Sequence, residues 1–325
     1  MKKLINDPEK LVDQMLDGLV KANPSKITRI KDTNVIARAD APVDGKVGII
    51  SGGGSGHEPA HAGFVGSGML DCAVAGEVFT SPTPDQILEA IKKSDAGKGV
   101  FMIVKNYQGD FMNFEMAKEM AEKEDIEVDY IIVADDIAVE KKEDRRGVAG
   151  TIFVHKTLGA MAENGASLTE IKEMADLIIN DIKSIGIATK ACTNPSDGKE
   201  SFLLGDNEFE MGIGIHGEEG IQKEEMKSAD DIVEEMADRL LKEIDDTSSQ
   251  YAVMVNGMGA TPEMELYLVN NSLADYLTEK NIKIARTYIG NFMTSMDMAG
   301  FSITLYKVDD ERLKLLDQEV DIVRK

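Results

Sequence analysis

The run Ile49–Pro59 reads IISGGGSGHEP, and we expect the rest of the chain to be organised around it. Its apolar start predicts a buried strand, four glycines follow within five positions, and His57 is expected at the start of a helix. Glycine allows a backbone to approach a ligand closely and to adopt positive φ. A glycine-rich turn between a strand and a helix commonly holds a polar ligand, and a tight structural turn is the alternative. Because four glycines are followed directly by a histidine, we favour a ligand site over a purely structural turn.

Strands and helices are predicted to alternate on both sides of this run. The predicted strands cover residues 47–50, 99–105, 128–133, 209–215, 251–256, 282–289 and 302–308. Helices are predicted to begin at Asp7-Pro8, at Pro84 and at Thr261-Pro262, and to cover residues 112–123 and 228–244. One more helix is predicted before the capping box Ser167–Glu170, and another begins at this box and extends to about residue 183. Residues 25–46 are expected to be irregular. This order predicts an α/β protein with two domains, residues 1–184 and 185–325, each with a mainly parallel sheet flanked by helices.

Composition excludes several classes of function. The 325 residues are 42% hydrophobic and 29% charged, and the net charge of −23 argues against binding to nucleic acid or to anionic membranes. No apolar run approaches the length of a membrane span. The two cysteines, Cys72 and Cys192, form neither a metal motif nor a disulfide framework. Because the start of the chain also lacks the pattern of a signal peptide, a cytoplasmic protein is expected.

The glycine run matches no nucleotide motif. Gly52 and Gly54 begin the dinucleotide fingerprint, but its third glycine falls on His57, and no Lys-Ser or Lys-Thr pair completes a Walker A motif. His57–His61 matches H-E-x-x-H by letter, but Pro59 lies inside the motif and a third ligand is not evident, so no metal site is expected. We expect His61 to be solvated or packed on a helix, and His155 to serve packing.

Three further polar residues are candidates for chemistry. Lys105 and Asp110 follow a predicted strand, and parallel sheets bind ligands at such ends. Asp110 alone fits a helix N-cap as well as a catalytic base, and the neighbouring Lys105 favours the base. His216 lies between small residues that leave its ring reachable, which suits a nucleophile or a ligand.

Taken together, seven runs resemble the dihydroxyacetone-binding subunits of phosphotransferase-dependent dihydroxyacetone kinases. They span nearly the whole chain in order, and no single run would suffice. The runs are Ser51–Pro59 (SGGGSGHEP), Phe79–Pro84 (FTSPTP), Lys105–Asp110 (KNYQGD), Arg145–Gly150 (RRGVAG), Gly212–Gly217 (GIGIHG), Asn256–Pro262 (NGMGATP) and Thr294–Thr304 (TSMDMAGFSIT).

The resemblance implies two α/β domains, a homodimer and a covalently held substrate. The imidazole of His216 would add to the ketone to form a hemiaminal, His57 would hydrogen-bond the bound substrate, and Asp110 would accept the proton of the hydroxyl that is phosphorylated. The resemblance also implies a set of pocket residues, Gly54, Ser55, Gly56 and Lys105, with Ser81 nearby. A reversible covalent bond suits so small a ketone, since noncovalent contacts to few atoms give limited affinity.

The phosphoryl donor is expected on another chain. ATP-using relatives append a helical nucleotide-binding domain, and the given sequence ends at Lys325 without one. The resemblance therefore implies a partner subunit that carries ADP and magnesium and is recharged from a phosphotransferase protein, ultimately from phosphoenolpyruvate. The chain departs from the family in three places: Glu219 replaces a proline, segment 139–144 is short, and the C-terminal end lacks a tryptophan. These departures concern the docking of the partner subunit and the details of the dimer more than the binding of the ketone.

Two other functions compete with the kinase. Some relatives bind dihydroxyacetone but act as coactivators of a transcription factor, and these can lose the acidic residue of the Lys-Asn-Tyr loop. Asp110 favours the kinase. A plain sugar-binding module with a structural glycine loop would require the histidines to be accidental.

Overall fold

The computed structural model describes residues 2–244 and 246–324 and confirms the α/β class. Contacts divide the chain into two units. Unit 1 contains the described residues of Met1–Val133, Phe153–Leu177 and Lys314–Lys325, and unit 2 contains those of Ala134–Ile152 and Ile178–Leu313. Both units are therefore built from segments that are separate in the sequence.

The predicted division at residues 184 and 185 stays a prediction. It differs from the grouping by contacts, which assigns 153–177 and the last residues to unit 1 and 134–152 to unit 2. The difference arises because each unit combines segments that are separate in the sequence, so one boundary in the sequence cannot divide them.

Unit 1 contains a six-stranded sheet in the order β1-β2-β5-β3-β6-β7. The strands are β1 (Ile27–Arg29), β2 (Val35–Arg38), β3 (Gly48–Ser55), β5 (Cys72–Val78), β6 (Val100–Lys105) and β7 (Val128–Val133). The four strands from β5 to β7 are parallel, and β1 and β2 are antiparallel additions. The mainly parallel sheet that we predicted is thus present in this unit.

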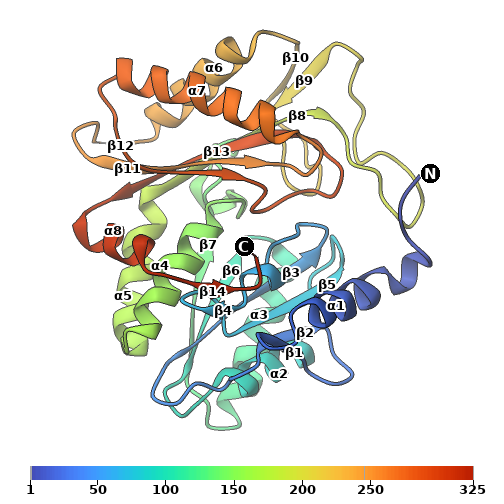
Figure 1. Cartoon of the computed structure of the whole chain (residues 1–325), viewed down its shortest axis with the longest axis vertical. Helices are drawn as coiled ribbons and strands as arrows, with labels where there is room; N and C mark the ends of the chain where they lie inside the picture. Colours follow the sequence, from blue (N-terminus) through green and yellow to red (C-terminus); the bar gives the residue numbers. More distant parts are fainter. Residues whose placement is uncertain (1, 245, 325) are drawn as a thin grey trace. The chain divides into compact units, whose positions relative to one another are not determined.

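The helices that lie wholly or mostly in unit 1 are α1 (Leu11–Ala22), α2 (Pro84–Ser94), α3 (Gln108–Glu122), α4 (Thr151–Glu163) and α5 (Leu168–Ile178), with short turns η1 (Pro8–Lys10) and η2 (Ala62–Phe64). Figure 1 shows α2 and α3 beside the unit 1 sheet, and their apolar faces share one core with β2, β3, β5 and β6. Because strand side chains alternate in direction, Ile50 of β3 enters this core whereas Ser51 points to the other face, where it contacts His61.

The second sheet, in unit 2, has the order β10-β9-β8-β13-β11-β12. Its strands are β8 (Ile182–Lys190), β9 (Glu208–Met211), β10 (Gln222–Glu225), β11 (Gln250–Gly257), β12 (Lys283–Gly290) and β13 (Ala299–Val308). Only β11 and β12 pair in parallel, and the other four pairs are antiparallel. The prediction of a mainly parallel sheet is wrong here, because β13 returns between β8 and β11 and is antiparallel to both.

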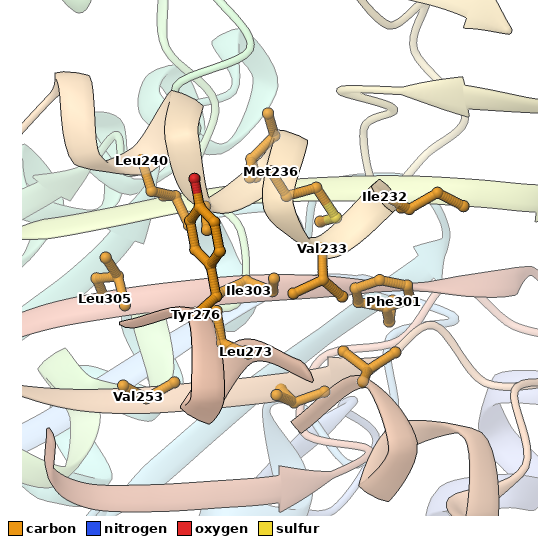
Figure 2. Packing of buried hydrophobic residues seen from close by; sticks show 14 of the residues in the cluster. Ile232, Val233, Met236, Leu240, Val253, Leu273, Tyr276, Phe301, Ile303 and Leu305 are labelled. Carbon is orange, nitrogen blue, oxygen red and sulfur yellow. The ribbon is translucent and has the colours of Figure 1, made fainter. Parts of the chain in front are cut away.

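The core of unit 2 lies between its sheet and two helices, α6 (Ala229–Lys242) and α7 (Glu263–Glu279). Figure 1 shows the two helices side by side over the sheet. Figure 2 shows their side chains meeting those of β11 and β13: Val233, Leu240 and Leu273 point toward Val253, Ile303 and Leu305. The remaining elements are η3 (Lys142–Asp144), η4 (Ile179–Asp181), α8 (Asp310–Asp317) and a small sheet of β4 (Gly66–Ser67) and β14 (Asp321–Ile322).

Local signals predicted most element starts and missed several short or Gly-rich strands. Asp7 caps the turn at Pro8, and Ser167 and Glu170 form the reciprocal capping box. Segment 25–46 is not irregular throughout, since it contains β1 and β2, and β5 and β8 had not been predicted. The predicted strand 209–215 ends at Met211, and the helix from Ser167 ends at Ile178 instead of about 183.

His57 does not begin an α-helix, so the helix expected to start there is wrong. Residues 57–61 form turns that lead into η2. Among residues 2–244 and 246–324, no helix has the length and apolar character needed to traverse a bilayer.

Candidate functional site

Polar residues of unit 1 gather where three parallel strands end. β3 ends in the glycine run and is followed by His57, β5 is followed by Phe79 and Ser81, and β6 ends at Lys105. β5, β3 and β6 are neighbours and parallel, so their carboxyl ends lie at the same edge of the sheet. This edge contains every predicted site residue except His216, which belongs to unit 2.

Lys105 and Asp110 form a buried ion pair at this edge. The Lys105 side chain is fully buried, and its Nζ lies 3.3 Å from Asp110 Oδ2. Asp110 is also buried, and its Oδ1 has no hydrogen-bond partner among the described residues. Asp110 lies in the first turn of α3, whereas Tyr107 is the N-cap, so the N-cap interpretation of Asp110 is wrong. One carboxylate oxygen is held by the lysine and the other remains available to accept a hydrogen bond.

Gly53 allows the glycine run to approach this ion pair. A Cβ atom at position 53 would overlap Lys105 Nζ and would lie 3.5 Å from Asp110 Oδ2. Gly54, Ser55 and Gly56 were predicted pocket residues, whereas Gly53 was not. Only the fold shows that β3 and β6 are neighbours and that residue 53 lies against the buried ammonium group.

The rest of the glycine run is held mainly by backbone contacts. A Cβ on Gly54 would lie 2.7 Å from Thr80 N, so this glycine permits close packing on the segment after β5. Ser55 Oγ donates to Gly76 O at 2.7 Å, and Gly56 N donates to the carboxylate of Glu58 at 3.1 Å. Burial raises the pKa of that carboxyl group, with the bond from Gly56 opposing it. Gly54 and Ser55 belong to β3, so the glycine-rich turn expected directly after residue 50 is wrong. The chain bends only from Gly56 onward, where it leads to His57.

His57 and Ser81 occupy defined places beside this turn. The His57 ring is buried and stacks on Phe79, with 5.2 Å between ring centroids and 19° between planes. Phe79 adopts φ +54°, a left-handed conformation that is uncommon outside glycine. Ser81 Oγ lies against Gly109, the residue before Asp110, where an added Cβ would be 2.8 Å away.

His61 and His155 form a buried pair that does not resemble a metal site. Ser51 Oγ donates its hydrogen to Ile103 O, so the 3.3 Å contact with His61 Nδ1 requires His61 to donate. The rings of His61 and His155 lie 5.2 Å apart, and both are buried. Because His155 belongs to α4, His61 is packed against a helix, as one of the two expected alternatives had it, and is not solvated. Burial, with a smaller effect of the Lys105 charge, lowers the pKa of His155 to about 3. Within the described residues, no three or more His, Cys, Asp or Glu side chains are grouped to hold a metal ion.

His216 lies in a glycine-rich loop of unit 2 between β9 and β10. Its side chain is partly exposed, and its Nδ1 lies 3.0 Å from Glu218 Oε1. Arg146 supports the loop, since its Nη2 donates to Gly212 O at 2.9 Å and its Nε donates to Asp136 Oδ2 at 2.8 Å. Glu218 was not among the predicted site residues. An acidic residue two positions after a candidate nucleophilic histidine is the signal that could have identified it.

Similarity to known proteins identifies the family of this chain. The Dak1 domain model matches residues 17–324, nearly the whole chain. This chain belongs to the Dak1 family. The expected resemblance is thereby confirmed, and the polar edge of unit 1 and the His216 loop of unit 2 are both parts of a Dak1 domain.

Similar proteins include a kinase subunit, a kinase and an operon co-activator. A Lactococcus lactis protein named as the dihydroxyacetone-binding subunit DhaK of a PTS-dependent dihydroxyacetone kinase is 52% identical, with 99% of this chain and 98% of that protein covered. The dihydroxyacetone kinase of C. freundii, in complex with AMP-PNP and Mg2+, matches with TM-score 0.93 and 34% identity over 99% of this chain and 60% of that one. A dihydroxyacetone kinase operon co-activator, Dha-DhaQ, matches with TM-score 0.90 and 39% identity over 94% and 96%.

Replacement of Gly53 by alanine tests the close approach to the ion pair. We expect Gly53→Ala to lower the free energy of unfolding by about 1–3 kcal/mol, because Lys105 must move away from Asp110 to make room for the methyl group. Gly18→Ala is the matched control. Gly18 lies inside α1 with no atom within 4 Å of an added Cβ, so alanine there should stabilise by up to about 1 kcal/mol. Urea denaturation measures both, and equal effects would contradict the packing described for Gly53.

Replacement of His155 by leucine tests whether this histidine stays neutral when folded. Its pKa in the folded chain is about 3 against an ordinary 6.5, so below pH 6.5 the unfolded chain binds a proton that the folded chain does not. The wild type should therefore lose about 2 kcal/mol more stability than His155→Leu between pH 7 and pH 5, at about 1.4 kcal/mol per pH unit. Urea denaturation at both pH values measures the difference. Parallel losses would show that folded His155 is also protonated.

Proposed function

We propose that this chain is the dihydroxyacetone-binding subunit of a dihydroxyacetone kinase and that it phosphorylates dihydroxyacetone together with a partner subunit. The observation that carries the proposal is the free oxygen of Asp110 in the buried pair with Lys105, in a chain that is similar over its full length to a kinase subunit. A base must lie within hydrogen-bond reach of the proton that it accepts. Oδ1 can accept from a substrate hydroxyl while Lys105 holds Oδ2 and balances the carboxylate charge.

The substrate is held as a hemiaminal in this proposal. The imidazole of His216 adds to the ketone carbon, and His57 donates a hydrogen bond to the oxygen of the adduct. Gly54, Ser55, Gly56 and Lys105 bind the substrate, with Ser81 beside them. A covalent bond to a carbonyl carbon selects a ketone against glycerol, which has no carbonyl group.

The phosphoryl group comes from a partner subunit that carries ADP and magnesium, recharged through a phosphotransferase protein from phosphoenolpyruvate. The name of the Lactococcus lactis relative supports dependence on a phosphotransferase system. We further propose that the chain acts as a homodimer in the cytoplasm, without nucleic acid or membrane as a partner. The charge of −23 supports this choice of partners.

A coactivator is the second candidate, because Dha-DhaQ matches the fold almost as well as the kinase does. Similarity of fold therefore does not separate the two functions. The acidic residue at position 110 favours the kinase, since a protein that only binds the ketone has no need of a base beside the hydroxyl.

The intact mass of the protein tests the covalent anchor. With dihydroxyacetone under mild ionisation, the wild type should gain the mass of one substrate per chain, and His216→Ala should gain none. Because His216 is partly exposed, its replacement should leave the fold intact, which circular dichroism checks. Absence of an adduct on the folded wild type would remove the hemiaminal from the proposal.

Replacement of Asp110 by asparagine separates binding from transfer. An asparagine side chain keeps the shape of the aspartate but cannot accept a proton, so in Asp110→Asn the adduct should persist while phosphorylation falls by at least about 100-fold. The assay uses phosphoenolpyruvate and the remaining subunits of the Lactococcus lactis kinase, with ATP and magnesium alone as a second arm in which no turnover is expected. Normal turnover of Asp110→Asn would refute the base. Turnover by the wild type with ATP alone would refute the partner donor.

A further inference from the structure

The His216 loop is fixed by backbone hydrogen bonds within unit 2. Gly212 N donates to Gly186 O at 2.7 Å, Gly214 N to Glu218 O at 3.1 Å and Gly217 N to Gly214 O at 3.1 Å. Gly212 and Gly217 both have φ +80°, which glycine adopts without strain. These bonds bring the residues on either side of His216 together, so that residue 218 lies beside the imidazole ring.

The Glu218 carboxylate binds His216 through both of its oxygen atoms. Oε2 accepts from the backbone N–H of His216 at 2.9 Å, and Oε1 lies 3.0 Å from His216 Nδ1. Burial raises the pKa of Glu218, but the bonds from the His216 side chain and backbone outweigh it and lower the pKa to about 2. Glu218 is therefore a carboxylate at neutral pH.

This contact determines which nitrogen of His216 carries the proton. A carboxylate can only accept hydrogen bonds, so Nδ1 must be the donor and must carry the hydrogen. A neutral imidazole has one N–H and one lone pair, so the lone pair is on Nε2. The nitrogen able to attack a carbonyl carbon is then Nε2, on the side of the ring away from Glu218.

Gly214 leaves room for the carboxylate. A Cβ atom at position 214 would overlap Glu218 Oε2 and would lie 2.7 Å from Arg146 Nη1. Arg146 is itself held by Asp136 and by Gly212 O. The carboxylate of Glu218 thus occupies a place that the loop provides, instead of extending freely into solvent.

We propose that Glu218 is a positioning residue for covalent capture of the ketone: it holds His216 in the Nδ1–H form and directs the Nε2 lone pair to the substrate. This inference rests on the proposed function. As Nε2 bonds to the carbonyl carbon, the π electrons of the carbonyl move to oxygen, and the imidazole gains positive charge that the carboxylate stabilises. The Nδ1 proton passes to Glu218 and from it to solvent, and the hemiaminal oxygen takes one proton from solvent, so charge and atoms balance.

Glu219 provides a matched control. It carries the same side chain one position later but is exposed, whereas Glu218 is partly buried against His216. Glu219→Gln removes the same charge from the same loop without removing the contact to Nδ1. If the charge of the loop alone mattered, the rate of adduct formation would change in the Glu218 and Glu219 variants alike. If Glu218 positions His216, the rate should change only in the Glu218 variants.

The experiment compares Glu218→Gln, Glu218→Ala and Glu219→Gln by the rate of adduct formation with dihydroxyacetone, followed by time-resolved mass spectrometry. We expect Glu218→Ala to be about 100-fold slower than wild type, Glu218→Gln to be intermediate because its amide oxygen can still accept from Nδ1, and Glu219→Gln to be unchanged. Wild-type rates in both Glu218 variants would overturn the proposal. Equal slowing in Glu219→Gln would overturn it as well.

A second measurement needs no substrate and distinguishes failure of this inference from failure of the proposed function. Nitrogen-15 NMR of the histidine rings at pH 8 reports the tautomer, and the His216 signal, one of four histidines, is assigned by its loss in His216→Ala. The wild type and Glu219→Gln should show Nδ1–H, and Glu218→Ala should shift toward Nε2–H. An Nε2–H form in the wild type would refute the role of Glu218 even if the adduct forms. Should the wild type show Nδ1–H but form no adduct, the hemiaminal would fail while the orientation by Glu218 would stand.

Discussion

Lys105 is completely buried, and a buried ammonium group is tolerated only when an opposite charge lies beside it. Asp110 supplies that charge from the first turn of α3, where a negative side chain also interacts favourably with the helix dipole. The ion pair also limits which residue can occupy position 53 of the neighbouring strand, because a side chain there would overlap Lys105 Nζ. Loss of one partner of such a pair costs about 3–5 kcal/mol, because the remaining charge stays buried. The polar end of this sheet therefore depends on one ion pair and one glycine.

Each unit holds a carboxylate at a place where a glycine leaves room for a charged group. In unit 1, a carboxylate is held through one oxygen by Lys105, and the other oxygen has no partner among the described residues. In unit 2, both oxygens of Glu218 are used to hold the ring and the backbone of His216. A glycine, Gly53 or Gly214, makes room for the charged group in each case. The first arrangement suits a base and the second suits the orientation of a nucleophile.

Membership of the Dak1 family does not decide between catalysis and regulation. A kinase and an operon co-activator both match this fold with TM-scores of 0.90 or more. We propose that the distinction depends on individual side chains, above all on Asp110, whose Oδ1 has no hydrogen-bond partner among the described residues. In a fold shared by enzymes and regulators, function follows from the groups that the site contains.

The sequence by itself determined the features that depend on near neighbours: the apolar start of β3 at residues 49–50, the capping box at Ser167 and Glu170, and the candidates Lys105, Asp110 and His216. Such signals arise from bonds and conformations within a few residues. Only the tertiary structure decided the direction of the strands in the second sheet, the exchange of segments between units and the places of Gly53 and Glu218. The physical reason is that strand direction, ion pairing and close packing depend on which groups the fold brings together. The local sequence does not specify how far apart these groups lie in space. Glu218 is near His216 in sequence, but its role depends on how the loop folds back.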